Sequence, residues 1–167
     1  MYDERKWKGI INNNVKEHGL LKWKQGMEKK STLKMYSEKE KPKKEIFYNG
    51  NKGSSLLFKA RTNSLEINDR TYRFNGSRDR WCKMCNRGVE ETLDHVIVEC
   101  SAYDTARDIA ISKYKGILGD NKFREIINLD DNGIGFLLGI GKETPDLVVE
   151  ISKSFLSQIW AKREKGQ

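Results

Sequence analysis

The chain has 167 residues, 34% of them charged and 37% hydrophobic, which suits one domain, or one domain with an extension, around a modest core. No apolar run approaches the length of a membrane span and the N-terminus lacks the hydrophobic region of a signal peptide, so we expect no contact with a membrane. The net charge of +8 is uneven, because residues 1–80 hold 20 Lys+Arg against 10 Asp+Glu and residues 81–167 hold 12 against 14.

Residues 1–45 are expected to form a basic helical segment that ends in a charged linker. The first helix covers 3–18 and should end at Gly19. A second, basic helix is expected over 20–30, and a short third helix follows after Ser31. The apolar residues of the first helix recur at helical spacing: Trp7, Ile10, Ile11 and Val15.

Residues 46–167 are expected to form a second domain, also helical. It begins with a short extended pair near 46–48, followed by a helix from Ser54 to about Asn63 and a short helix from about Asn68. Further helices are expected over 102–115 and 121–129. The inward residues of the first of these are expected to be Tyr103, Ala106, Ile109 and Ala110.

The last helix has the clearest start, where Thr144 caps, Pro145 takes the first helical position and Asp146 follows. Its apolar stripe is expected to be buried, and it consists of Leu147, Val148, Ile151, Phe155, Ile159 and Trp160. The predicted fold class is therefore all-α, a small helical domain held together by one Cys3His zinc knuckle.

All three cysteines and one of the two histidines lie within nineteen residues, in the order C-x2-C-x9-H-x4-C. Three thiolates and one imidazole complete the tetrahedral shell of a structural zinc, whereas a catalytic zinc needs an open position. Because reduced metal-binding cysteines fit a reducing compartment, we expect the nucleus or the cytoplasm. The four predicted ligands of this single zinc are Cys82, Cys85, His95 and Cys100.

No catalytic constellation is recognisable, so we expect no enzyme and no small-molecule substrate. The stretch ending in Lys142 lacks the first glycine and the Ser/Thr of a phosphate-binding loop. Asp146, Glu150 and Lys153 resemble a nuclease site with one residue too many, and are expected to lie on a solvated helix face.

The order of motifs resembles the C-terminal zinc-knuckle region of non-LTR (LINE, jockey-like) retrotransposon reverse transcriptases. The resemblance is carried by K-A-R-T-N-S-L-x-x-N-x-R-T over 59–71, C-x2-C over 82–85, E-T-L-x-H over 91–95 and E-C-x-x-Y-x-x-x-R over 99–107. It covers roughly residues 5–110. It implies a helical module that helps to hold RNA or DNA beside a polymerase.

The chain lacks the polymerase's paired catalytic aspartates, because Asp130-Asp131 follows Asn-Leu and not Tyr-x. We therefore expect either a fragment or a stand-alone derivative, binding RNA or single-stranded DNA with low sequence specificity. The alternative is a protein–protein assembly subunit that docks through the apolar stretch 133–140 and the last helix. Trp81 either stacks on a base or covers the zinc. The candidate nucleic-acid contacts are Lys22, Lys24, Lys29, Lys30, Lys43, Lys44, Lys59, Arg61, Arg70, Arg73, Arg78, Arg80 and Trp81.

Overall fold

The computed structural model describes residues 4–37, 39–42, 44–45, 49–76, 79–129, 133–140 and 146–166. Within these ranges the fold is all-α, as the sequence predicts, and the extended pairing is limited to one isolated antiparallel bridge between Trp81 and Glu90. No described helix is both long and apolar enough to cross a membrane. The chain divides into two units, Met1–Lys44 and Glu45–Gln167, one residue from the expected boundary.

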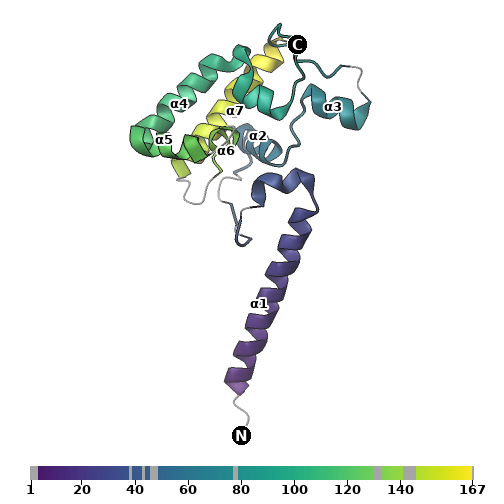
Figure 1. Ribbon diagram of the computed structural model, residues 1–167, viewed down its shortest axis with the longest axis vertical. Helices are drawn as coiled ribbons and strands as arrows, with labels where there is room; N and C mark the ends of the chain where they lie inside the picture. The colour runs from purple at the N-terminus through teal and green to yellow at the C-terminus, as the bar shows by residue number, and fades with distance from the viewer. Residues whose placement is uncertain are drawn as a thin grey trace. The chain divides into compact units, whose positions relative to one another are not determined.

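Unit 1 (Met1–Lys44) contains one long helix, α1 (Glu4–Glu28), and the 3-10 helix η1 (Ser31–Tyr36), both visible in Figure 1. The prediction of two helices separated at Gly19 is wrong. Gly19 takes an ordinary helical conformation, and a Cβ there would meet nothing within 4 Å. A mid-helix glycine costs about 1 kcal/mol relative to alanine. The helix-forming residues on both sides of Gly19 offset this cost.

The apolar stripe of α1 is exposed to solvent. Val15 is 66% exposed and Trp7 54%, whereas Met27 near the end of the helix is buried. Most helical stability in proteins comes from packing an apolar face against another element. Because the stripe of α1 is exposed, it is available to a partner. Its exposed members are Trp7, Ile10, Ile11, Val15 and Leu21.

Unit 2 (Glu45–Gln167) begins with α2 (Lys52–Arg61) and α3 (Asn68–Asn75). The cap of α2 is Asn51, which accepts the amide of Ser54 at 2.8 Å, so Ser54 lies inside the helix it was expected to begin. The helix α3 begins where it was predicted. The extended pair expected at 46–48 lies outside the described residues.

The C-terminal half of unit 2 consists of α4 (Asp104–Leu118), α5 (Asp120–Leu129), α6 (Ile134–Leu137) and α7 (Asp146–Gly166). The helix α7 packs against both α2 and α4, as Figure 1 shows. Its approach to α2 is so close that a Cβ on Gly53 would lie 3.0 Å from the Cβ of Lys153. The residues that open α7 in the sequence, Thr144 and Pro145, lie outside the described residues.

The predicted stripe of α7 is buried at its centre and exposed at its start. Ile151, Phe155 and Ile159 are in the core, whereas Leu147 is 62% exposed and Trp160 is half-buried. In α4, Ile109 is 40% exposed, against expectation, whereas Ala110 and Tyr114 are buried.

The docking surface expected over 133–140 is contradicted by the structure. Phe136, Leu137 and Leu138 are buried, and the Phe136 ring packs on the rings of Tyr114 and Phe123 with centroids 4.4 and 5.3 Å away. The stretch is apolar because it fills the core between α4, α5 and α7.

Replacing Phe155 with alanine is expected to lower the melting temperature of unit 2 by about 10–20 °C. The side chain is 1% exposed, and truncation of a buried phenylalanine costs about 3–5 kcal/mol through lost burial and the cavity left behind. Differential scanning calorimetry measures the shift. Leu147→Ala on the same helix is the matched control and should change little, because its side chain is exposed. Equal melting temperatures for both variants would contradict this packing.

Candidate metal centre

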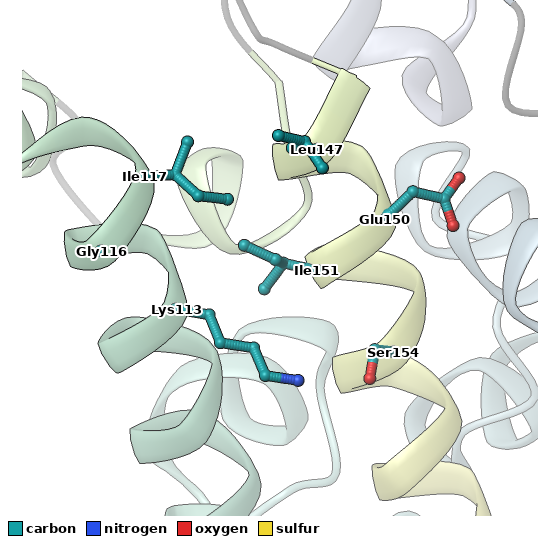
Figure 2. A pocket seen from close by; sticks show the side chains of 7 residues that line it. All are labelled: Lys113, Gly116, Ile117, Leu147, Glu150, Ile151 and Ser154. Carbon is teal, nitrogen blue, oxygen red and sulfur yellow. The ribbon is translucent and has the colours of Figure 1, made fainter.

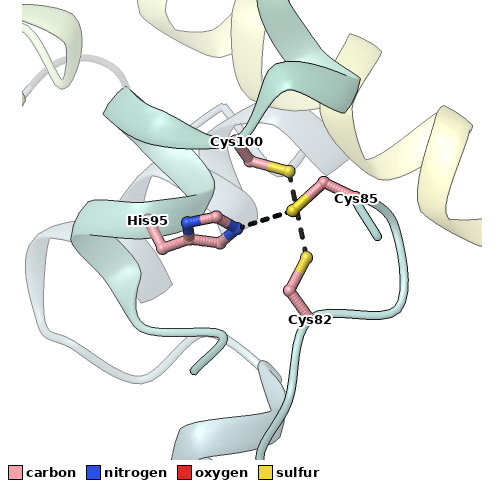
Figure 3. A group of neighbouring side chains, drawn as sticks. All are labelled: Cys82, Cys85, His95 and Cys100. Carbon is pink, nitrogen blue, oxygen red and sulfur yellow. Dashed lines mark hydrogen bonds between the residues drawn. The ribbon is translucent and has the colours of Figure 1, made fainter. Parts of the chain in front are cut away.

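The four predicted ligands meet at one point of unit 2. Their side chains are buried, and one ligand atom from each lies within 4.8 Å of all the others. Figure 3 shows the imidazole of His95 and the sulfurs of Cys82, Cys85 and Cys100 pointing toward one another. The cluster can hold one metal ion.

Two of the ligand–ligand distances are close to those around a tetrahedral ion of zinc size. Metal–sulfur bonds of about 2.3 Å place two tetrahedral sulfurs about 3.8 Å apart, and a shorter metal–nitrogen bond brings that separation to about 3.6 Å. The sulfurs of Cys82 and Cys100 are 3.8 Å apart, and the sulfur of Cys85 lies 3.3 Å from Nε2 of His95. The donor atoms, three soft sulfurs and one imidazole, are those that Zn²⁺ prefers.

The first two ligands lie on a tight loop. The amide of Cys82 donates to the carbonyl of Val89 at 2.8 Å, and the turn closes through Arg87 N–H to the Cys85 carbonyl at 2.7 Å. Gly88 follows with a φ of +62°, which an L side chain rarely adopts. Burial raises the pKa of the Cys82 thiol, although hydrogen bonds from the backbone amides of Cys85 and Met84 oppose this effect.

The other two ligands bracket the single π-helical turn η2 (His95–Glu99). An α-helical turn would place Cys100 well away from the face that carries His95. In η2 the amide of Cys100 donates to the carbonyl of His95 at 2.7 Å, and this wider five-residue turn brings both side chains to the same point. The helical segment that includes η2 begins at Leu93, later than predicted, and ends at Glu99 as predicted.

Groups around the ligands hold them in place. The outer nitrogen of His95, Nδ1, lies 3.4 Å from the carboxylate of Glu99, which fixes the ring with Nε2 directed inward. Arg107 at the start of α4 donates to the carbonyls of Ile97 and Cys100, both at 3.1 Å. The metal cluster is thereby joined to α4.

A buried ion pair lies at the base of this region, and no local sequence pattern indicated it. Glu91 and Arg163 are 1% and 4% exposed, and the Arg163 guanidinium donates to the Glu91 carboxylate. The other oxygen of Glu91 accepts the amide of Asn68 at 2.8 Å, at the start of α3. Glu91 therefore joins α3 and α7 to the segment that carries His95, whereas we expected it to lie in the first turn of a helix.

The arrangement is closed, since all four positions of a tetrahedral ion are taken by protein atoms. Burial raises the pKa of the Cys100 thiol to about 12, so this sulfur becomes a thiolate only when a cation balances its charge. Such a centre stabilises a fold and leaves no coordination site for a substrate. Comparison of the chain with protein-family models, curated proteins and solved structures gives no match.

The predicted nucleic-acid contacts are dispersed. The exposed ones are Lys22, Lys24, Lys29, Lys30, Lys44, Arg73 and Trp81, and the half-buried ones are Lys59, Arg70 and Arg80. Lys43 and Arg78 lie outside the described residues.

The prediction that Arg61 contacts nucleic acid is wrong, because its side chain is 4% exposed and cannot reach a phosphate. Its guanidinium donates to the carbonyls of Leu138 and Gly139 at 2.9 and 2.8 Å, where it satisfies the end of α6, and lies 3.6 Å from the carboxylate of Glu45.

A shallow pocket of about 420 Å³ lies between α4 and α7, with Ile117, Leu147 and Ile151 converging on it in Figure 2. Glu150 at its edge is bound by the Lys153 ammonium at 2.5 Å, and Lys153 is buried, so these two residues do not share the solvated face that we expected. Of the charged residues at the pocket, Glu150 is engaged in this structural contact.

Proposed function

We propose that the protein is a non-enzymatic, zinc-containing module that binds RNA or single-stranded DNA with low sequence specificity. One Zn²⁺ at Cys82, Cys85, His95 and Cys100 holds the fold, and the basic unit 1 binds the phosphates. The donor set and the separation of 3.8 Å between two of the sulfurs support zinc.

The segregation of charge between the two units carries the proposal. Residues 1–44 hold 13 Lys+Arg against 6 Asp+Glu, a balance of +7, whereas residues 45–167 hold 19 against 18. Nearly all the excess charge of the chain therefore belongs to a quarter of its length. A one-sided positive field attracts polyanions and raises their association rate.

The lysines at the end of α1 are placed to meet phosphates. Lys22 and Lys24 are exposed along the helix, and Lys29 and Lys30 are exposed directly after it. None of these four takes part in an ion pair among the described residues, in contrast to Lys59 with Glu66 and Arg73 with Asp69. Release of counterions by such lysines drives binding without reading the bases.

Reversing Lys22, Lys24, Lys29 and Lys30 to glutamate is expected to weaken binding to all sequences alike and to flatten its salt dependence. Each lost phosphate contact removes about 0.7 from the log–log slope for a single strand. Fluorescence anisotropy with labelled uridine and thymidine oligonucleotides at several salt concentrations measures both quantities. Zinc content should stay unchanged.

The matched control reverses four cationic residues of unit 2 to glutamate. Its net charge changes by the same amount as that of the unit 1 variant, but the change lies in unit 2. The proposal would be contradicted if the unit 1 variant bound as tightly as wild type. It would also be contradicted if the unit 1 and unit 2 variants lost the same affinity. The control positions are exposed residues of α4 and α5: Lys113, Lys115, Lys122 and Arg124.

The order of motifs shared with non-LTR reverse transcriptases supports this reading, and we propose that the chain derives from such a C-terminal region. The alternative proposal is an assembly subunit, and the exposed apolar stripe of α1 favours it. Capture of a protein partner that survives nuclease treatment and is lost in Trp7→Glu would support the alternative.

A further inference from the structure

Exposed aromatic side chains gather on one segment of unit 2. Among the residues that the structure describes there, the aromatic rings more than 40% exposed are Phe58, Tyr72, Phe74 and Trp81. Three of the four lie in 68–88, which covers α3, the approach to the metal cluster and the loop of its first two ligands. Gathered exposed aromatic rings of this kind mark an interaction surface.

The same segment is the basic part of unit 2. Residues 68–88 hold 6 Lys+Arg against 2 Asp+Glu, although the whole unit is balanced to within one charge. The rest of the unit is therefore slightly acidic. A ligand that suits both features carries negative charge and flat apolar rings, which is the chemistry of an unpaired nucleotide strand.

The backbone of Trp81 is held on both sides while its ring stays 46% exposed. It forms the antiparallel bridge with Glu90, its carbonyl accepts the amide of the Asn68 side chain at 2.7 Å, and its own amide donates to Asp79 at 3.0 Å. The next residue is the metal ligand Cys82. The ring is thus mounted on a backbone held by several hydrogen bonds, which lowers the entropy lost when a base stacks on it.

The guanidinium of Arg80 reaches over two rings. Its central carbon lies 5.2 Å from the centre of the Trp81 ring and 5.5 Å from that of Tyr72, and Glu90 holds it at 3.0 Å. Aromatic rings and guanidinium planes are the two protein groups on which splayed bases stack. Tyr72, Arg80 and Trp81 together offer both.

We propose that Tyr72, Arg80 and Trp81 form a base-stacking site that makes the protein prefer single-stranded over double-stranded nucleic acid. The inference rests on the proposed nucleic-acid binding and adds to it a specificity that the lysines of unit 1 cannot supply. Phosphates are present in both forms, whereas the bases of a duplex are already stacked and unavailable to a protein ring.

The test compares wild type, Trp81→Ala, Trp81→Phe and Tyr72→Ala on a labelled uridine oligonucleotide and on a duplex of equal length. Trp81→Ala should weaken binding to the single strand by about 5- to 100-fold and leave duplex binding unchanged. Trp81→Phe, which keeps a ring, should retain most of the affinity. Phe58→Ala, 45% exposed on α2, is the matched control and should leave both affinities unchanged.

The outcomes separate this site from the general proposal. If Trp81→Ala and Tyr72→Ala bind the single strand as wild type does while the lysine reversal in unit 1 abolishes binding, the stacking site is refuted and the nucleic-acid function stands. If Trp81→Ala loses zinc and both affinities together, the ring has a structural role and the inference is also refuted. If wild type binds neither probe at low salt, both proposals fail.

Discussion

We expect the Cys85→Ser protein to be purified without the single zinc ion that we propose for wild type, and with residues 80–107 unfolded. Cys85 is buried and its sulfur contacts Nε2 of His95 at 3.3 Å, so its loss opens the shell at the centre of the cluster. Structural zinc sites of this kind contribute about 10–16 kcal/mol of apparent binding free energy, which the folded state alone receives.

The loss should spread into α4. Arg107 binds the carbonyls of Ile97 and Cys100, and Tyr103 beside them is 1% exposed, so the first turn of α4 depends on the geometry of η2. Elemental analysis measures zinc per chain, and hydrogen exchange over 80–118 measures the order of the loop and the helix. Without a cation the Cys100 thiol would stay protonated, because burial raises the pKa of Cys100 to about 12.

Met84→Ser is the matched control for this experiment. Met84 lies in the same loop and is half-buried, and its side chain is not one of the four ligands. The zinc content and hydrogen exchange of the Met84→Ser protein should therefore match those of wild type. A Cys85→Ser protein with unchanged zinc content, or a wild-type protein with no stoichiometric metal, would show that the cluster is only a group of buried thiols.

The metal cluster was predictable because its signal is local. All four candidate ligands lie in nineteen residues at a spacing typical of zinc sites, so no knowledge of the tertiary fold was needed to find them. The exit of the chain at Glu99 followed from the same requirement, since Cys100 has to return to the ion. The class of the fold was predictable for a similar reason, because helical periodicity and caps are read within a window of a few residues.

What the sequence could not give were the contacts made between distant segments. Arg61 read as a free cation on a helix, but it meets carbonyls 77 and 78 residues away, which buries it. Gly19 read as a helix end, because glycine is common there, and nothing local distinguishes that use from a tolerated glycine inside an exposed helix. The partner of Glu91 lies 72 residues away, so its burial left no local trace.

Glu91→Ala should destabilise unit 2 by about 4–7 kcal/mol, more than any single core truncation considered above. Two losses combine in this variant. Arg163 is left buried without a counter-charge, which costs about 3–5 kcal/mol, and the amide of Asn68 at the start of α3 loses its acceptor, which costs about 0.5–2 kcal/mol. Burial alone would lower the pKa of Arg163, but the hydrogen bond and charge of Glu91 hold it above its ordinary value, so the guanidinium stays charged.

Urea unfolding of four variants separates these terms, and the double variant decides the argument. Glu164→Ala removes the exposed pair with Lys52, one residue from Arg163, and should cost less than about 1 kcal/mol because water screens that pair. The double variant Glu91→Leu with Arg163→Met leaves no unpaired charge, so most of the stability should return and only the lost acceptor of Asn68 should remain. Arg163→Ala alone should cost about 3–5 kcal/mol, since it leaves the carboxylate buried. If the double variant is as unstable as the sum of the two single losses, the charges are not coupled, and the anchoring of α7 to the metal segment rests on packing alone.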